Sequence, residues 1–155
     1  MQVILPPLQL YQKDVLQYYI DNPHDKWCVV KSPRQCGKSV LLAILLIYAS
    51  LVEVKSWSLS ISPIFAQARK IYNDVVNIAG PLIKRSNSSQ LEITFINGSA
   101  VKFGSAEQGD SLRGYTTKHA GILCVDECSF IKNDFFYSIY HYFGDCYMKR
   151  IRIFF

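Results

Sequence analysis

The segment that decides the fold reads WCVVKSPRQCGKSVLLAILLIYASLV and occupies residues 27–52. It begins with a short apolar run of the kind that forms a strand buried on both faces. A polar loop over residues 31–39 follows, and the apolar stretch 40–52 comes directly after it. That stretch is too short for a membrane span, which takes roughly 20 apolar residues. We therefore expect a strand, a loop and a helix buried inside the protein.

The loop has the chemistry of a phosphate-binding loop. Such a loop needs inward-facing backbone N–H groups, a lysine that reaches the terminal phosphates and a hydroxyl for Mg²⁺. The helix N-terminus adds its partial positive charge. The usual first glycine is replaced by Ser32, and a plain strand-to-helix turn with a surface lysine is the alternative reading. The predicted nucleotide-binding residues are Ser32, Pro33, Arg34, Gln35, Cys36, Gly37, Lys38 and Ser39, with Ser39 as a Mg²⁺ ligand.

A second apolar run, residues 122–125, ends in Asp126-Glu127. Ligands of open α/β sheets bind at the carboxyl ends of the strands, where these two acids are expected. We predict that Asp126 holds Mg²⁺, directly or through water, and that Glu127 orients and polarises the attacking water. A solvated acidic turn is the alternative for this segment alone. The two signals together are far more specific than either, because parallel strands bring their ends to one edge.

The remaining pattern predicts an α/β fold with a mostly parallel sheet and helices on both faces. Helical spacing marks residues 8–20 and 63–79, and Asn97-Gly98 joins two alternating runs into a hairpin over 91–103. Strands near 27–31, 57–61 and 121–126 are expected side by side. We expect a basic loop around Lys84 and Arg85, a loop over 105–118 and an aromatic helix over 135–143. Residues 141–155 show no clear period.

Composition excludes several protein classes. Half of the 155 residues are hydrophobic and 19% are charged, which rules out a disordered tail and supports one buried core. The net charge is +5, but three basic residues lie in the last seven positions, so no strong field for nucleic acid covers the rest. No export signal or membrane span is evident, and the five cysteines are expected as free thiols in a reducing compartment.

The residues together resemble the large terminase subunits of tailed phages, which are DNA-packaging ATPases. The run 34–39 is similar to that family's divergent phosphate loop, in which the first glycine is often replaced. Gln12 lies upstream of the loop, like the family's adenine-reading glutamine. The segment 111–114, Ser-Leu-Arg-Gly, precedes the acidic strand, as a Leu-Arg-Gly segment does in many terminases. The resemblance covers about residues 8–134.

This resemblance implies a P-loop NTPase of the additional-strand, catalytic-glutamate type. It implies that ATP hydrolysis with Mg²⁺ drives double-stranded DNA into a procapsid. The implied partners are a portal protein, a small terminase subunit and further copies in a ring, in the cytoplasm of an infected bacterium. We interpret residues 1–155 as a partial P-loop ATPase domain that lacks the family's nuclease domain and coupling motif. An apparently truncated sheet would leave an exposed edge beside the acidic strand.

Two arginines are candidates for one catalytic role. Arg34 lies inside the loop, where it is able to contact the γ-phosphate of ATP bound to its own subunit. Arg113 is favoured here as an arginine finger that contacts the ATP of a neighbouring subunit. Two other functions stay open from the sequence. One is a helicase-like P-loop ATPase, and the other is a nucleotide- or DNA-binding remnant without turnover.

Overall fold

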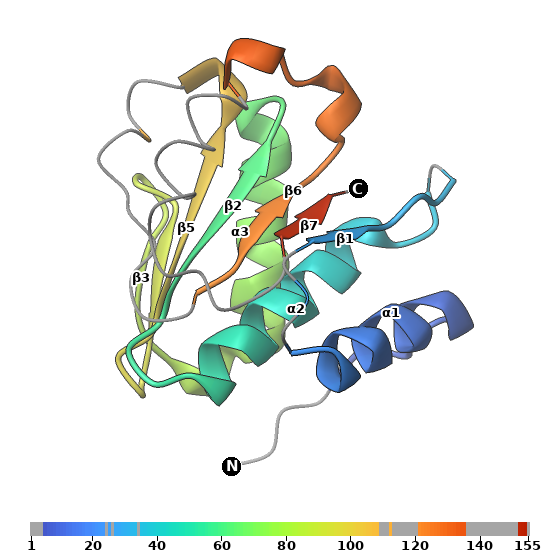
Figure 1. The fold of residues 1–155 in the computed structure, drawn as a ribbon. Coiled ribbons are helices and arrows are strands. Elements are labelled where there is room, and N and C mark those ends of the chain that lie inside the picture. The colour runs from blue at the N-terminus through green and yellow to red at the C-terminus, as the bar shows by residue number, and fades with distance from the viewer. Residues whose placement is uncertain are drawn as a thin grey trace.

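Seven strands form one sheet in the order β1-β7-β6-β2-β5-β4-β3 (Figure 1). The structure is a computed structural model that describes residues 5–23, 25, 27–33, 35–108, 112, 121–135 and 152–154. The strands are β1 (Trp27–Val29), β2 (Trp57–Ser62), β3 (Ile83–Asn87), β4 (Glu92–Phe95), β5 (Ala100–Ser105), β6 (Leu123–Val125) and β7 (Arg152–Phe154). The helices are α1 (Leu10–Asp21), α2 (Lys38–Val52) and α3 (Phe65–Ala79), with short 3₁₀ turns η1 (Gly80–Leu82), η2 (Ala106–Gln108) and η3 (Cys128–Phe130).

The sheet is mostly parallel, which confirms the predicted α/β class. β1, β7, β6, β2 and β5 all run parallel, and only β4 is antiparallel to its neighbours β5 and β3. The predicted hairpin is confirmed as β4 and β5, and its turn contains Gly98 with φ of 83°. Because β5 also pairs with β2, the hairpin continues the sheet and is not a separate appendage.

The position of β7 corrects two predictions. The strand 27–31 does not lie next to 121–126, because β7 is inserted between β1 and β6. Ile153 is the partner of Cys28 on one side and of Cys124 on the other. The acidic strand β6 therefore has neighbours on both sides, and the expectation of an exposed edge beside it is wrong. The two edges of the described sheet are β1 and β3.

The predicted basic loop is also wrong, since Lys84 and Arg85 lie in the edge strand β3. This strand pairs only with β4, and its three central side chains are exposed. An exposed edge strand needs no alternation of apolar and polar residues, so the pattern that reveals half-buried strands is missing here. Most of the expected aromatic helix over 135–143 and most of the loop over 105–118 lie outside the described residues.

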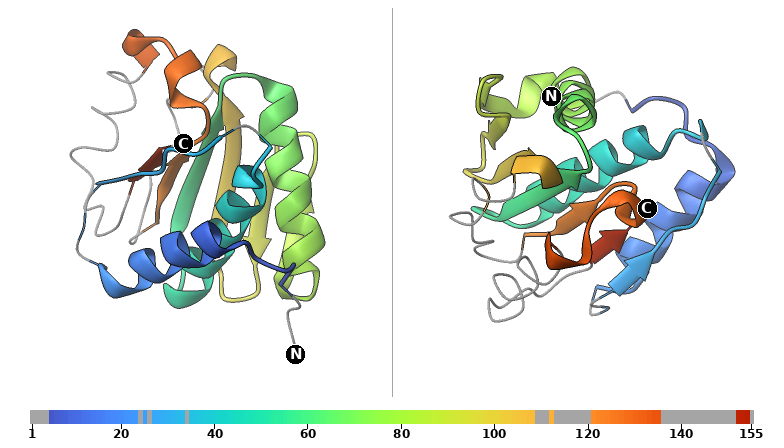
Figure 2. Two further views of the ribbon diagram at one scale, coloured as in Figure 1. Left: turned by 90° about the vertical axis from the view of Figure 1, so that its right-hand side faces the viewer. Right: turned by 90° about the horizontal axis from the view of Figure 1, so that it is seen from above.

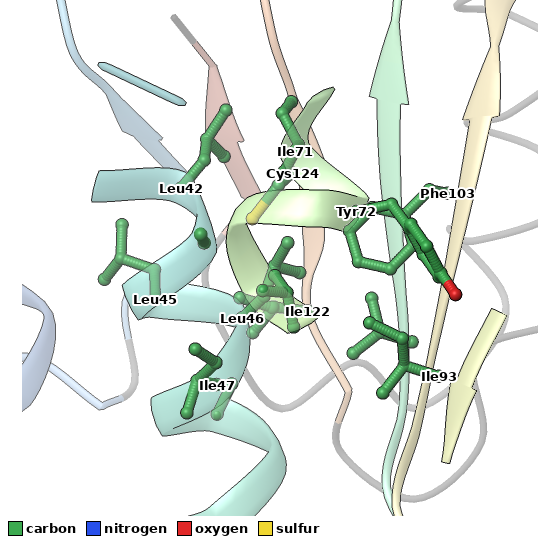
Figure 3. Close-up of a cluster of buried hydrophobic side chains, with 14 of the residues drawn as sticks. Leu42, Leu45, Leu46, Ile47, Ile71, Tyr72, Ile93, Phe103, Ile122 and Cys124 are labelled. Atoms are coloured by element: carbon green, nitrogen blue, oxygen red, sulfur yellow. The ribbon is translucent and has the colours of Figure 1, made fainter. Parts of the chain in front are cut away.

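Helices α2 and α3 lie together on one side of the sheet (Figure 2). α2 is apolar around its whole circumference, and nine of its fifteen residues are buried. α3 is amphipathic and buries the face that contains Ala68, Ile71 and Val75. Figure 3 shows how side chains of both helices meet those of the sheet, including Leu42, Leu45, Leu46, Ile71, Tyr72, Phe103, Ile122 and Cys124. Tyr72 and Phe103 pack edge to face with ring centroids 5.6 Å apart.

A smaller apolar cluster covers the opposite face. Successive residues of a strand point to opposite sides, so Ile122 and Cys124 join the helical side while Leu123 and Val125 join the other. The buried members of this second cluster are Leu59, Ile61, Leu112, Leu123, Val125 and Ile131. Both described long helices that pack on the sheet thus lie on one face. In the described part of the chain no helix is long and apolar enough to cross a membrane.

Gly121 sets how closely the chain entering β6 approaches β2. A methyl group at this position would lie 1.6 Å from the Trp57 carbonyl oxygen, which is backbone and has nowhere to move cheaply. Leu59 N–H donates to the Ile122 carbonyl at 2.9 Å, and this bond depends on the same close approach. The glycine is therefore a packing requirement of the central sheet.

We predict that Gly121→Ala lowers the free energy of unfolding by about 2 kcal/mol or more, because the two backbones must separate. Gly80→Ala is the matched control, since nothing lies within 4 Å of a methyl group added there. Urea denaturation followed by circular dichroism measures both. Equal stability of the Gly121 variant and the unaltered chain would show that this approach is not tight.

Candidate functional site

Three of the predicted site residues, Lys38, Asp126 and Glu127, lie at one edge of the sheet. The loop 31–37, here called the candidate phosphate loop, follows β1, and Lys38 begins α2 directly after it. Asp126 and Glu127 follow the parallel strand β6, so they share the carboxyl edge with that loop. The Lys38 ammonium is near enough to act on the pKa of Asp126. The structure thus brings together the two predicted signals from segments about 90 residues apart.

The candidate phosphate loop is folded back on itself. Gln35 and Gly37 have positive φ angles of 61° and 85°, which turn the chain sharply into α2. The Lys38 Nζ donates hydrogen bonds to the carbonyl oxygens of Ser32 at 3.4 Å and Pro33 at 3.2 Å. The Cys36 thiol donates to the Pro33 carbonyl at 2.8 Å. The lysine thus spans the loop and holds its ammonium at the loop's centre.

Asp126 is a buried carboxylate with an unsatisfied atom. Asp126 is only 6% exposed, and its Oδ1 atom has no hydrogen-bond partner among the described residues. Burial raises its pKa, and the Glu127 carboxylate raises the pKa further, while a backbone hydrogen bond at Glu127 and the charges of Lys38 and Lys70 act in the opposite direction. A buried carboxylate oxygen without a partner is costly. Such an atom at a strand end suits a bound cation or an ordered water.

Glu127 is held by a neighbouring helix. Its backbone is left-handed, with φ of 46°, which turns the chain away from the end of β6. The Gln67 Nε2 in the first turn of α3 donates a hydrogen bond to Glu127 Oε2 at 3.0 Å. One carboxylate oxygen is therefore fixed in direction by α3, which follows the neighbouring strand β2.

Helix α1 contacts the candidate phosphate loop from outside. The Tyr11 hydroxyl donates to the Cys36 carbonyl at 2.5 Å, and Gln12 Nε2 donates to the Gly37 carbonyl at 2.9 Å. Gln12 is 3% exposed, and its Oε1 accepts a hydrogen bond from the Gln9 backbone N–H at 2.8 Å. The structure therefore places Gln12 against the loop. Its role as a reader of adenine stays a prediction.

The other predicted site residues divide into two groups. Ser39 follows Lys38 in the first turn of α2, and Ser32, Pro33, Gln35 and Cys36 lie in the candidate phosphate loop. Arg34 and Arg113 lie outside the described residues, so both finger assignments stay predictions.

Sequence reasoning missed Tyr11, Gln67 and Lys70. Gln67 and Lys70 are three residues apart on α3, hence on one face of the helix. That helix begins just after β2 ends at the same carboxyl edge, so the rule that predicted Asp126 also pointed to the start of α3. Tyr11 carried no separate signal beyond its place beside Gln12.

The donor set fits ATP and Mg²⁺ chemically. Lys38 offers a positive charge at the centre of a loop that leads into a helix N-terminus, where phosphate binding is favoured. The unpartnered Asp126 Oδ1 is a hard oxygen ligand of the type that Mg²⁺ takes, and the Ser39 hydroxyl is the predicted second protein ligand. Two protein oxygens occupy only part of the octahedral coordination of Mg²⁺, and phosphate oxygens and water usually fill the other positions.

The family is decided by a sequence model. The model described as terminase large subunit, T4likevirus-type, N-terminal, matches residues 30–138, which is more than half of the chain. The chain belongs to the large terminase family. The match begins at the end of β1 and extends past Asp126-Glu127, so it includes both predicted signals. No curated protein matches the chain in sequence.

Solved terminase structures share the fold at low sequence identity. The HK97 bacteriophage large terminase superposes with a TM-score of 0.76 at 21% identity, over 96% of this chain and 33% of that one. A large terminase from a thermophilic bacteriophage gives 0.71 at 13% identity, over 96% and 39%. The Thermus phage P74-26 large terminase ATPase domain gives 0.59 at 19% identity, over 83% and 57%. The chain thus spans about a third of the length of the HK97 terminase.

Asp126 buries a carboxylate oxygen that has no hydrogen-bond partner, so we predict that removing its charge increases the free energy of unfolding. Its folded-state pKa is raised above the unfolded value of about 4. Deprotonation between acidic and neutral pH therefore weakens the fold. Without divalent ions, Asp126→Asn should raise the free energy of unfolding at pH 7 by about 1–3 kcal/mol. The gain should shrink below about pH 4, where the aspartate is protonated in both states.

Thermal unfolding in chelator at pH 7 and at a pH below about 4 measures this difference. Glu107→Gln, at an exposed position of η2 directly after the parallel strand β5, is the control for loss of one carboxylate at the same edge. A loss of stability for Asp126→Asn at pH 7 would contradict the assignment of an uncompensated buried charge.

Proposed function

We propose that this chain binds ATP with Mg²⁺ at the carboxyl edge of its sheet and hydrolyses the β–γ phosphoanhydride bond. In this proposal the hydrolysis powers the packaging of double-stranded DNA into a phage procapsid. The observation that carries the proposal is the convergence of Lys38, Asp126 and Glu127 at one edge, with an unpartnered oxygen on Asp126. Family membership and the likeness to terminase ATPase domains support it.

Each residue receives a role from its surroundings. Lys38 exchanges its hydrogen bonds to the loop carbonyls for bonds to phosphate oxygens, because a phosphate is the stronger, charged acceptor. Asp126 and Ser39 hold Mg²⁺, which neutralises charge on the phosphates when it is bound. Glu127 accepts a hydrogen bond from the attacking water and orients it toward the terminal phosphorus. Gln67 restricts the rotation of the Glu127 carboxylate through the 3.0 Å hydrogen bond.

The partners follow from the family and are part of the proposal. They are double-stranded DNA, a portal protein, a small terminase subunit and further copies of the chain in a ring. The family match favours this reading over a helicase-like ATPase. The alternative of a module that binds nucleotide without turnover is decided by the kinetic measurement below.

Two variants separate binding from chemistry. Lys38→Ala should weaken ATP binding at least ~10-fold, because it removes a charge-assisted hydrogen bond to phosphate. Glu127→Gln should bind ATP within about threefold of the unaltered chain and lose ~10²–10⁴ in turnover, since the amide cannot polarise water. The glutamine oxygen still accepts the bond from Gln67, so the Glu127→Gln variant differs from the unaltered chain in chemistry and not in packing.

Isothermal titration with a non-hydrolysable ATP analogue measures binding, and phosphate release measures turnover. Equal loss of binding in both variants would assign a structural role to Glu127. Binding without any turnover in the unaltered chain would favour the nonmotor module.

The arginine assignment predicts a rescue in mixed rings. If Arg113 acts on a neighbour, Arg113→Ala should lower turnover in an assembled ring by ~10³ or more while ATP binding is kept. Mixing that variant with Glu127→Gln subunits should restore part of the activity, because some interfaces then combine an intact Glu127 with an intact Arg113. Phosphate release from the mixed ring measures the rescue. No rescue in a ring shown to be mixed would assign the role to Arg34.

A further inference from the structure

Two consecutive carbonyl groups of the candidate phosphate loop are held by helix α1. The Cys36 carbonyl accepts the Tyr11 hydroxyl at 2.5 Å. The Gly37 carbonyl accepts Gln12 Nε2 at 2.9 Å, and its second lone pair accepts the Leu41 N–H at 3.2 Å as the first bond of α2. Neighbouring residues of one helix therefore fix neighbouring peptide groups of the loop.

The orientation of a carbonyl also sets the orientation of an amide. In a trans peptide the C=O and the next residue's N–H point in opposite directions in one plane, and the described residues contain no cis peptide. The carbonyls of Cys36 and Gly37 point at α1, so the N–H groups of Gly37 and Lys38 point away from it. The Lys38 N–H is also one of the donors at the start of α2 that have no partner within the helix.

We propose that Tyr11 and Gln12 are positioning residues that aim the amides of Gly37 and Lys38 at phosphate oxygens. This inference rests on the proposed function, because it names how the same site binds the phosphate chain. The two side chains act through the peptide planes of the loop and do not touch the phosphates. The ligand chemistry is a polyphosphate, with or without a base.

Gln12 has both ends of its side-chain amide engaged. Its Oε1 accepts from the Gln9 N–H at 2.8 Å, its Nε2 donates to the Gly37 carbonyl, and the residue is 3% exposed. Gly37 leaves space for this contact, since a methyl group there would lie 2.7 Å from Gln12 Nε2. Each end of the amide keeps one further hydrogen-bonding site, so the two bonds do not by themselves exclude contact with a base. The bonds that the structure shows all serve the loop and the start of α1.

The Tyr11 hydroxyl is suited to donate its hydrogen bond to the Cys36 carbonyl at every physiological pH. Burial raises its pKa to about 12, and the nearby Cys36 side chain contributes to the rise. The hydroxyl therefore keeps its proton throughout the physiological range, and its effect on the loop should not vary with pH. Removing the hydroxyl frees the Cys36 carbonyl to rotate, and the Gly37 amide rotates with it.

The test uses tripolyphosphate, which carries the phosphate chain without a base. Tyr11→Phe removes one oxygen and should weaken the binding of tripolyphosphate and of ATP by the same factor, about 3- to 10-fold, as loss of one orienting hydrogen bond implies. Tyr18→Phe is the matched control on the same helix, because its hydroxyl donates to Asp25 and not to the loop. The control should bind both ligands like the unaltered chain.

Amide chemical shifts give a readout that does not depend on ligand. In Tyr11→Phe the Gly37 amide resonance should shift in NMR spectra, because its peptide plane is no longer held, while resonances of the sheet stay unchanged. Gln12→Met should weaken ATP, GTP and tripolyphosphate by one factor. If Gln12→Met instead loses only the preference between ATP and GTP, Gln12 reads the base and its positioning role is overturned.

The remaining outcomes separate this inference from the proposed function. Tight binding of tripolyphosphate by Tyr11→Phe, equal to that of the unaltered chain, would overturn the positioning role and leave the nucleotide site intact. Failure of the unaltered chain to bind either tripolyphosphate or ATP would overturn both.

Discussion

The burial of α2 is the constraint on which the rest of the structure depends. This helix is apolar on every side, so it is stable only when α1, α3 and the sheet surround it. Leu41, Leu42, Leu45 and Leu46 are fully buried, which fixes both the rotation and the depth of the helix. The first residue of α2 is Lys38, so the same packing sets the position of the candidate phosphate loop at the sheet edge. The packing of the core therefore also determines the geometry of the candidate site.

The far end of α2 is anchored as well. The Asn97 Nδ2 in the β4–β5 turn donates to the Ser50 carbonyl at 2.7 Å, and the Ser99 hydroxyl donates to the Glu53 carbonyl at 2.7 Å. These bonds satisfy carbonyl groups that the end of a helix leaves without partners. α2 is thus held at its C-terminus by the hairpin and at its N-terminus by the loop that α1 supports, which leaves it little freedom to slide.

Elements with a strong local signal were predictable from sequence, and elements defined by their neighbours were not. β2, the hairpin and the three helices lie within two or three residues of their predicted bounds, because periodicity and the Asn97-Gly98 turn mark them. β7 has three residues, too few for an alternating pattern to mark it, and it is defined by its pairing with β1 and β6. The terminase resemblance implied an additional strand, but nothing in the local sequence placed a strand at residues 152–154.

The candidate site divides in the same way. Lys38, Asp126 and Glu127 were predictable, because each belongs to a short local motif that follows an apolar strand. Gln67 is 60 residues from Glu127 in sequence, and its contact arises because α3 starts where β2 ends beside β6. The burial that leaves Asp126 Oδ1 without a partner is likewise a tertiary property. No local pattern distinguishes it from a solvated acidic turn.

The loop conformation explains why a helix outside the site has to take part in it. Gln35 adopts φ of 61°, a left-handed conformation that costs a residue with a side chain about 1–2 kcal/mol, and Gly37 adopts 85°. The glycine usual at the start of such a loop is replaced by Ser32, so backbone freedom there is smaller. Strained conformations persist only where surrounding contacts determine them. Here those contacts come from Tyr11 and Gln12 on one side and from Lys38 within the loop. In the proposed function the Lys38 bonds are exchanged for bonds to phosphate, and the loop then depends on the two side chains of α1 and on the Cys36 thiol bond to Pro33.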